Sequence, residues 1–274
     1  MSNKFIIYKG SGGLAHMLRG LAHCIKLANI TQRYLIIDCK CNKGFGCNFN
    51  DFFKIDGLKY SDNYDIIPST YNFKGFTLEE LKKQKISCDN RSYYIFGYII
   101  SDFDERSNDD IVIYGGTGGN KLIGNLRVND NIMSLLNKEP QINDKYISVH
   151  FRNTDIKNSF DKFSTRIKRA IMTTKINTVY WASDDYKSFD KLCKKHPNVK
   201  FIRYTIPAEK VIRNIHSETK DKFKQIYDCL KDIYFILKSD YFIPSNNSGM
   251  SLYIKLMIND KNIFRINSKT IILN

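Results

Sequence analysis

The chain has 274 residues, of which 42% are hydrophobic and 26% are charged, and its formal net charge is +15. This composition is that of a folded globular protein and excludes an intrinsically disordered chain. Apolar runs are short, such as 233–237, whereas a membrane span needs roughly 20 apolar residues. The sequence therefore predicts a globular protein without a membrane span.

The positive charge permits a role in binding nucleic acid or another anion. However, the basic residues are scattered in short clusters such as Lys82-Lys83 and Lys194-Lys195. No homeodomain, zinc-finger or RNP-like pattern accompanies them, so we expect no specific nucleic-acid partner. A positive field also suits a small polyanion such as a nucleotide diphosphate, and charge alone does not decide between these interpretations.

The seven cysteines are an odd number without framework spacing. Cys39, Cys41 and Cys47 lie close together, but no CxxC pair or neighbouring histidine accompanies them, and we expect no metal site. The N-terminus shows no secretory signal. These features predict reduced thiols and a cytoplasmic location.

The first elements form a βαβ unit. A strand at 4–8 leads into Gly10-Ser-Gly-Gly13, which an amphipathic helix at 14–29 and a strand at 33–38 follow. The glycine loop therefore lies at a helix N-terminus, where backbone N–H groups favour anions. It lacks the GxGxxG pattern, and a tight structural turn explains it equally well.

The rest of the first half is less regular. Residues 39–75 show no clear periodicity, and Thr77-Leu-Glu-Glu80 is a capping box that predicts a short helix to about residue 85. Strands are expected at 93–100 and 111–114, and a helix at 130–137. We predict a linker at 140–145, which divides the chain into an acceptor-side α/β domain at 1–140 and a Rossmann-like domain at 141–274.

The second half alternates regularly between strands and helices. The expected order is strand 146–151, helix 161–174, strand 178–182, helix 186–195 and strand 199–204. This alternation predicts a parallel sheet with helices on its faces. A helix at 223–237, a strand at 241–243, a polar turn at 244–249 and a helix at 251–258 complete the domain.

Charged side chains follow the strands of this predicted sheet. His150, Arg152 and Asp155 lie at the carboxyl end of the first strand, where open α/β sheets bind ligands. The planar fork of Arg152 is suited to gripping phosphate, although an Arg–Asp pair in a structured turn is the simpler alternative. Asp184 and Asp185 follow the next strand, where one of them could merely cap the following helix.

Asp232 lies on a helix whose apolar residues surround it, so we expect its carboxylate to be largely buried and to need a donor. A neighbouring lysine could supply that donor. A carboxylate can also bind the N1–H and exocyclic amine of guanine. Ser248 precedes the last helix, whose N-terminus is another place for phosphate.

Four stretches together resemble the fucosyltransferases that use GDP-fucose, a superfamily that includes α1,6-fucosyltransferases and protein O-fucosyltransferases. Val149-His-Phe-Arg-Asn-Thr-Asp155 is similar to the family's His-x-Arg-Arg-x-Asp motif, and Ala182-Ser-Asp-Asp185 to its Ala-Thr/Ser-Asp-Asp. The segment from Asp232 through Ser248 matches the helix–strand–serine segment. Gly12-Gly-Leu-Ala-His-Met-Leu-Arg-Gly20 is similar to the glycine-rich opening of the family.

The resemblance implies a GT-B-like fold, in which two Rossmann-like α/β domains with parallel sheets face each other across a cleft. It implies that His150 and Asp232 contact guanine, and that Arg152 and Ser248 hold the diphosphate. Gly12 and Gly13 would lie across the cleft, while Asp184 and Asp185 would shape the donor site. Two family positions differ here, because Asn153 replaces the second arginine and His16 replaces the loop asparagine.

The implied reaction is an inverting transfer of fucose from GDP-fucose to a hydroxyl of a glycan or protein. Arg152, backbone N–H groups and helix N-termini can stabilise the leaving GDP without a metal or other cofactor. Asp155 and His16 are the candidate bases, and Asp155 could instead orient Arg152. One alternative is a metal-dependent GT-A glycosyltransferase that uses Asp102 and Asp104. A second is a non-catalytic basic protein that binds nucleic acid or another anion.

Overall fold

The computed structural model describes residues 4–10, 12–40, 42, 44–85, 87–89, 92–100, 108–116, 124–153, 158–207, 221–259, 261–266 and 269–273. The chain divides into two compact units, Met1–Asn129 and Asp130–Asn274. The sequence places its domain boundary at 140/141 instead, and the roles assigned to the two domains stay predictions.

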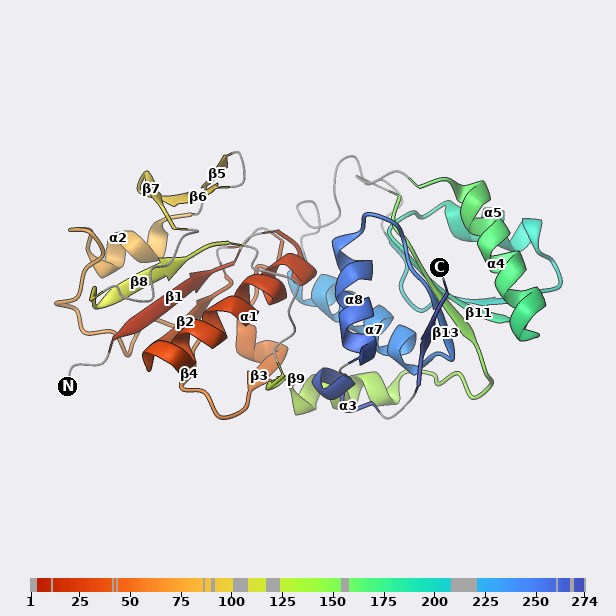
Figure 1. Cartoon of the computed structure of the whole chain (residues 1–274), viewed down its shortest axis with the longest axis horizontal. Helices are drawn as coiled ribbons and strands as arrows, with labels where there is room; N and C mark the ends of the chain where they lie inside the picture. Colours follow the sequence, from red (N-terminus) through yellow and green to blue (C-terminus); the bar gives the residue numbers. More distant parts are fainter. Residues whose placement is uncertain are drawn as a thin grey trace. The chain divides into compact units, whose positions relative to one another are not determined.

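The first unit is built around a four-stranded parallel sheet with the strand order β4-β2-β1-β8 (Figure 1). Its strands are β1 (Phe5–Lys9), β2 (Tyr34–Asp38), β4 (Tyr60–Ser61) and β8 (Ile111–Tyr114). Helix α1 (Leu14–Thr31) connects β1 to β2 and buries an apolar stripe that includes Leu14, Leu18 and Leu21. The predicted βαβ unit is therefore present, with the glycine loop at the N-terminus of α1.

Smaller elements surround this sheet. Helix α2 (Leu78–Lys83) begins at the predicted capping box, in which Thr77 and Glu80 bond each other's backbone N–H groups. Strands β3 (Phe53–Ile55) and β9 (Leu126–Val128) pair antiparallel, after the 3₁₀ turn η1 (Phe49–Asp51). These strands are not predicted from the sequence, because three residues are too few to show a period.

The prediction of a single strand at 93–100 is wrong. The chain forms an antiparallel sheet of β5 (Ser87–Asp89), β6 (Ser92–Ile95) and β7 (Tyr98–Ile99). Phe96 and Gly97 turn the chain between β6 and β7 with φ values of 48° and 80°. Positive φ at both turn residues matches the twist of a tight hairpin. Such turns usually have Asn, Asp or Gly at the first position, so Phe96 gave no sign of a turn in the sequence.

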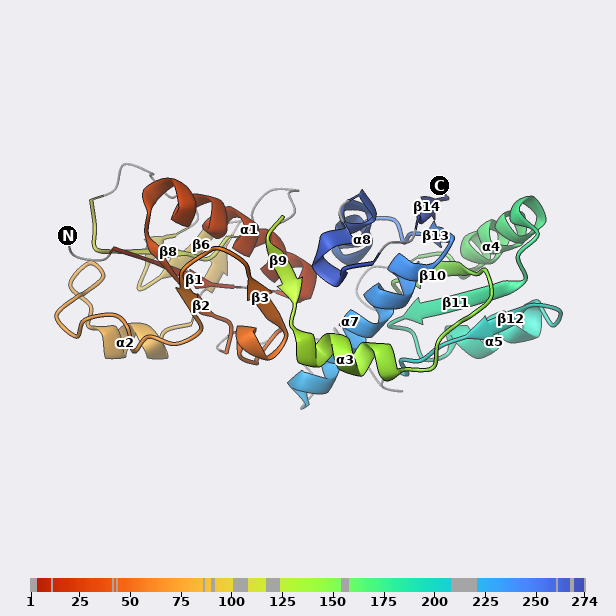
Figure 2. The same ribbon diagram turned by 90° about the horizontal axis from the view of Figure 1, so that it is seen from below.

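The second unit contains a five-stranded parallel sheet with the order β12-β11-β10-β13-β14. Its strands are β10 (Ile147–Phe151), β11 (Thr178–Ser183), β12 (Lys200–Ile202), β13 (Tyr241–Ile243) and β14 (Ile271–Ile272). Its helices are α3 (Asp130–Lys138), α4 (Phe160–Thr174), α5 (Ser188–Lys195), α7 (Lys222–Lys238), α8 (Gly249–Asn259) and the 3₁₀ turn η2 (Lys261–Phe264). Figure 2 shows this unit from a second direction.

Both faces of this sheet are covered. One face packs Val149 and Trp181 against residues of α4 and α5, such as Ile167. On the other face Tyr180 lies 5.3 Å from Phe235 of α7, measured between ring centroids. Helices on both faces explain why the central strands are almost wholly buried, since each successive side chain meets a helix. The predicted α/β class with parallel sheets is confirmed.

The strand order reverses at β10, because β11 and β12 lie on one side of it and β13 and β14 on the other. In open α/β sheets, ligands bind beyond the carboxyl ends of the two central strands at such a switch point, here β10 and β13. The fold thus marks the residues after Phe151 and Ile243 as the place for a ligand. Within the described ranges, no helix combines the length and the apolar character needed to cross a membrane.

Candidate functional site

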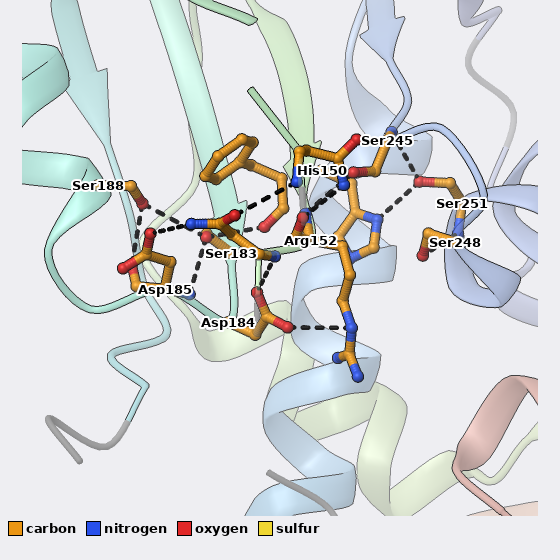
Figure 3. A network of polar contacts seen from close by, with 12 residues as sticks. His150, Arg152, Ser183, Asp184, Asp185, Ser188, Ser245, Ser248 and Ser251 are labelled. Carbon is orange, nitrogen blue, oxygen red and sulfur yellow. Dashed lines mark hydrogen bonds and ion pairs between the residues drawn. The ribbon is translucent and has the colours of Figure 1, made fainter. Parts of the chain in front are cut away.

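Two segments meet at the switch point of the second unit (Figure 3). The backbone N–H of Arg152, just after β10, donates to Ser245 Oγ at 3.0 Å. His150 Nδ1 lies 2.7 Å from Ser251 Oγ, which also accepts the backbone N–H of Ser245 at 2.9 Å. These bonds join the end of β10 to the turn after β13 and to the first turn of α8.

Ser248 caps the N-terminus of α8. Its Oγ accepts the backbone N–H of Ser251 at 3.3 Å, and its carbonyl accepts that of Leu252 at 3.0 Å. The side chain is 6% exposed. The N-terminal end of this helix therefore lies at the switch point, where its dipole favours an anion. A phosphate contact by Ser248 itself stays a prediction.

Arg152 is held by Asp184. The Nε atom of Arg152 lies 3.0 Å from Asp184 Oδ2, and the side chains are 14% and 7% exposed. Asp184 Oδ1 accepts the backbone N–H of Asn153 at 2.7 Å. Both carboxylate oxygens of a buried Asp184 thus face donors from the turn after β10. This fixes the direction of the guanidinium, as Figure 3 shows.

Asp185 orders the two turns that flank this pair. Its Oδ2 accepts Asn153 Nδ2 at 2.8 Å, and its Oδ1 accepts the backbone N–H of Lys187 at 3.1 Å, just before α5. Asn158 Nδ2 in turn donates to the carbonyl of Arg152 at 2.6 Å. Asp185 therefore orders the turn that leads into α5, whose N-cap is Lys187. It also binds the side chain of Asn153.

Asp232 forms a separate polar group on α7. Its Oδ1 accepts the hydroxyl of Tyr180 at 2.6 Å, and Thr205 Oγ1 lies 2.8 Å from Oδ1 and 2.9 Å from Oδ2. Burial raises the pKa of Asp232 to about 7, although the two hydroxyl groups oppose that rise. Asp232 is half-buried, and hydroxyl groups rather than a lysine supply its donors.

His150 is neutral near pH 7. Burial is the main cause that lowers the pKa of His150 to about 4, and the positive charge of Arg152 lowers it further. Asp184 acts in the opposite direction but does not compensate. A neutral imidazole carries one donor and one acceptor nitrogen, so its hydrogen-bond partners decide which edge it presents.

The glycine loop of the first unit is shaped by close backbone contacts. Gly12 has a φ of +73°, and a Cβ atom added to Gly44 would lie 2.1 Å from the Gly12 carbonyl oxygen. Both positions therefore require glycine. Gly13 is the N-cap of α1, and His16 lies exposed in the first turn. The roles predicted for Gly12, Gly13 and His16 in binding or catalysis stay predictions.

Three predicted site residues, Asp102, Asp104 and Asp155, lie outside the described residues. Among those that are described, no group of three or more His, Cys, Asp or Glu side chains could hold a metal ion.

Four residues that take part in these hydrogen bonds are not among those predicted from the sequence. Ser245 and Ser251 share a three-residue spacing with Ser248, which places all three at one helix start, and this spacing is the signal that could have found them. Tyr180 and Thr205 bind Asp232 across 52 and 27 residues of sequence. No local sequence pattern predicts those two contacts.

The fold and site together define a doubly wound α/β protein with a polar, arginine-led site at the switch point of its second unit. Solved fucosyltransferase structures share this fold throughout the chain. NodZ alpha-1,6-fucosyltransferase soaked with GDP-fucose is 16% identical, with a TM-score of 0.61 over 93% of this chain and 92% of that one. Fucosyltransferase NodZ from Bradyrhizobium is 14% identical, with a TM-score of 0.59 over 93% and 94% of the two chains.

POFUT1 in complex with GDP-fucose is 10% identical, with a TM-score of 0.61 over 99% of this chain and 98% of that chain. No protein-family model matches the sequence. No curated protein sequence matches it either. The fold that the resemblance implies is therefore confirmed.

Proposed function

We propose that this protein is a glycosyltransferase that transfers a sugar, fucose, from its GDP-linked donor to a hydroxyl group of a glycan or protein. The main support for this proposal is the ion pair in which Asp184 fixes Arg152 at the switch point, beside the N-terminus of α8. The shared fold supports it, since NodZ and POFUT1 structures contain GDP-fucose. A basic binding protein would not need an arginine oriented in this way.

The donor diphosphate would bind Arg152, Ser248 and the backbone at the start of α8. The contact of Arg152 Nε with Asp184 Oδ2 fixes the direction of the guanidinium group. Arginine matches phosphate through two parallel N–H donors, which a lysine cannot supply. The partial positive charge at the N-terminus of α8 would also attract the diphosphate.

The guanine base would bind His150 and Asp232. The N1–H and exocyclic amine of guanine are two adjacent donors, and an ionised carboxylate is an acceptor at both oxygens. Uracil lacks this pair and adenine lacks the N1–H. We therefore assign the preference for GDP over UDP and ADP to Asp232, which Tyr180 and Thr205 hold in place.

In the proposed reaction, the bond between the anomeric carbon of fucose and the β-phosphate oxygen breaks, and the acceptor oxygen bonds to that carbon from the opposite face. Negative charge develops on the leaving GDP, where Arg152 and α8 stabilise it without a metal. The acceptor's proton passes to a base, for which Asp155 and His16 are the candidates.

A thermal-shift experiment with GDP, UDP, ADP and a short RNA tests this proposal. We expect GDP to raise the melting temperature most and to compete with GDP-fucose. Arg152→Ala should abolish most of the shift, whereas Arg169→Ala removes the same charge from an exposed position on α4 and should change little. Equal shifts with all three nucleotides, or a shift with RNA alone, would contradict the proposal.

A further inference from the structure

The hydrogen bonds around His150 determine which of its ring nitrogens carries the proton. Ser251 Oγ lies 2.7 Å from His150 Nδ1 and accepts the backbone N–H of Ser245 at 2.9 Å. The Ser251 side chain is 1% exposed, so water cannot serve its hydroxyl group. The hydroxyl proton therefore needs an acceptor within the protein.

Two arrangements fit a 2.7 Å distance between these atoms. If Nδ1–H donated to Ser251, the buried hydroxyl proton would have no acceptor in the parts of the chain that the structure describes. Leaving a buried donor unsatisfied is unfavourable. If Ser251 O–H donates to Nδ1, both the hydroxyl and the ring nitrogen are satisfied. A positively charged ring would also carry a hydrogen on Nδ1, and the Ser251 hydroxyl proton would again lack an acceptor among the described residues.

We propose that Ser251 is a positioning residue that holds His150 in the neutral form with its proton on Nε2. His150 then presents a hydrogen-bond donor to the ligand, and its partner must be an acceptor atom. The serine acts through the histidine and need not touch the ligand itself. This assignment of the ligand partner rests on the proposed function, since it takes GDP as the ligand.

The assignment divides recognition between two residues with opposite properties. His150 would donate through Nε2, whereas Asp232 accepts at its carboxylate oxygens. The burial that lowers the pKa of His150 to about 4 maintains the neutral ring, together with Arg152 and against Asp184. A neutral N–H group selects hydrogen-bond acceptors, whereas a positively charged ring would attract any anion.

The protonated nitrogen can be observed directly in the ligand-free protein by long-range ¹H–¹⁵N spectra of the histidine rings. The chain has five histidines, and His150→Gln identifies the signals of His150. We expect the proton on Nε2 in the wild type and a mixture of both neutral forms in Ser251→Ala. The dissociation constant for GDP should rise about 2- to 10-fold, the effect of one weakened hydrogen bond.

Two further variants separate positioning from packing. Ser251→Thr keeps the hydroxyl group and should keep the Nε2 proton. Ser164→Ala is the matched control, because Ser164 Oγ lies 2.7 Å from His196 Nε2 and is also 1% exposed. It should alter the His196 signals alone and leave GDP affinity unchanged.

A wild-type proton on Nδ1, or an unchanged His150 spectrum in Ser251→Ala, would overturn the inference. If Ser251→Ala does not fold, the wild type and Ser251→Thr still decide it. A wild type that carries the proton on Nε2 but binds no GDP would contradict the proposed function and leave the role of Ser251 intact.

Discussion

Each unit carries an ion pair at the carboxyl ends of two neighbouring parallel strands. In the first unit, Lys9 ends β1 and its Nζ lies 2.6 Å from Asp38 Oδ2 at the end of β2. In the second unit, Arg152 follows β10 and its Nε lies 3.0 Å from Asp184 Oδ2 after β11. The two pairs occupy equivalent positions in the two sheets.

The two pairs differ in what surrounds the cation. Lys9 is 3% exposed and also donates to the carbonyl of Gln84 at 3.1 Å, while Tyr64 donates to Asp38 at 2.6 Å. Arg152 is 14% exposed, and its Nε engages Asp184. Cations at equivalent strand ends can therefore differ in how fully their neighbours enclose them. Lys9 is enclosed by partners of the core, whereas the ligand contact proposed for Arg152 needs the exposed part of its side chain.

The largest effect on folding should come from breaking the first pair. Lys9→Met leaves Asp38 buried without its cation, and breaking a buried ion pair typically costs about 3–5 kcal/mol. Chemical denaturation would show this as a lower midpoint. The double variant Lys9→Met/Asp38→Leu should recover most of the loss, because it leaves no unpaired charge. A stable Lys9→Met protein would show that the pair does not serve the core.

The largest effect on activity should come from the second pair. Arg152→Ala removes an oriented donor from the leaving group, and such losses typically lower kcat about 10²–10³-fold. Transfer or hydrolysis of GDP-fucose measures this, with the melting temperature as the control for folding. Arg152→Lys keeps the positive charge but lacks the two parallel N–H donors of the guanidinium, so we expect it to restore little of the turnover. Near-normal turnover in folded Arg152→Ala would remove this residue from the mechanism.

Asp232→Asn should separate binding from folding. Its side-chain oxygen can still accept from Tyr180 and Thr205, so we expect the fold to persist. Its amide cannot accept the second guanine donor, and GDP binding should weaken by about 1–3 kcal/mol. Calorimetric titration with GDP measures the loss. Normal affinity in this variant would make Asp232 a core residue like Lys9.

The raised pKa of Asp232, about 7, predicts opposite effects of pH on binding and on stability. GDP needs the ionised carboxylate, so its affinity should fall up to about tenfold per pH unit below pH 7. Because the folded pKa exceeds the unfolded value, this group stabilises the fold fully below about pH 4, and that contribution is lost as the pH rises through 7. Both trends should be weaker in Asp232→Asn, which controls for ionisation of GDP itself.

The smallest expected effect is that of removing metal ions. Arg152 supplies the positive charge at the proposed leaving group, so EDTA should leave the rate of fucose transfer unchanged. If EDTA abolishes turnover and Mn²⁺ restores it, the GT-A alternative with Asp102 and Asp104 would become the better account.

Local sequence patterns determined the main elements and the position of the candidate site. Apolar residues at strand and helix spacing predicted the βαβ unit of the first half and the parallel sheet of the second, and most predicted bounds lie within two residues of those observed, as for α4 (Phe160–Thr174). His150, Arg152 and Asp184 were found because residues that follow parallel strands share one edge of a sheet. These features depend on neighbours in sequence.

Only the tertiary structure decided which side chains meet. The sequence suggested Asp155 as the partner of Arg152, whereas the structure identifies Asp184 as one partner, 32 residues away. His150 meets Ser251 across 101 residues, and Asp232 meets Thr205 across 27. Hydrogen bonds need donor and acceptor within about 3 Å. Such proximity follows from strand order and helix packing, which no short stretch of sequence encodes.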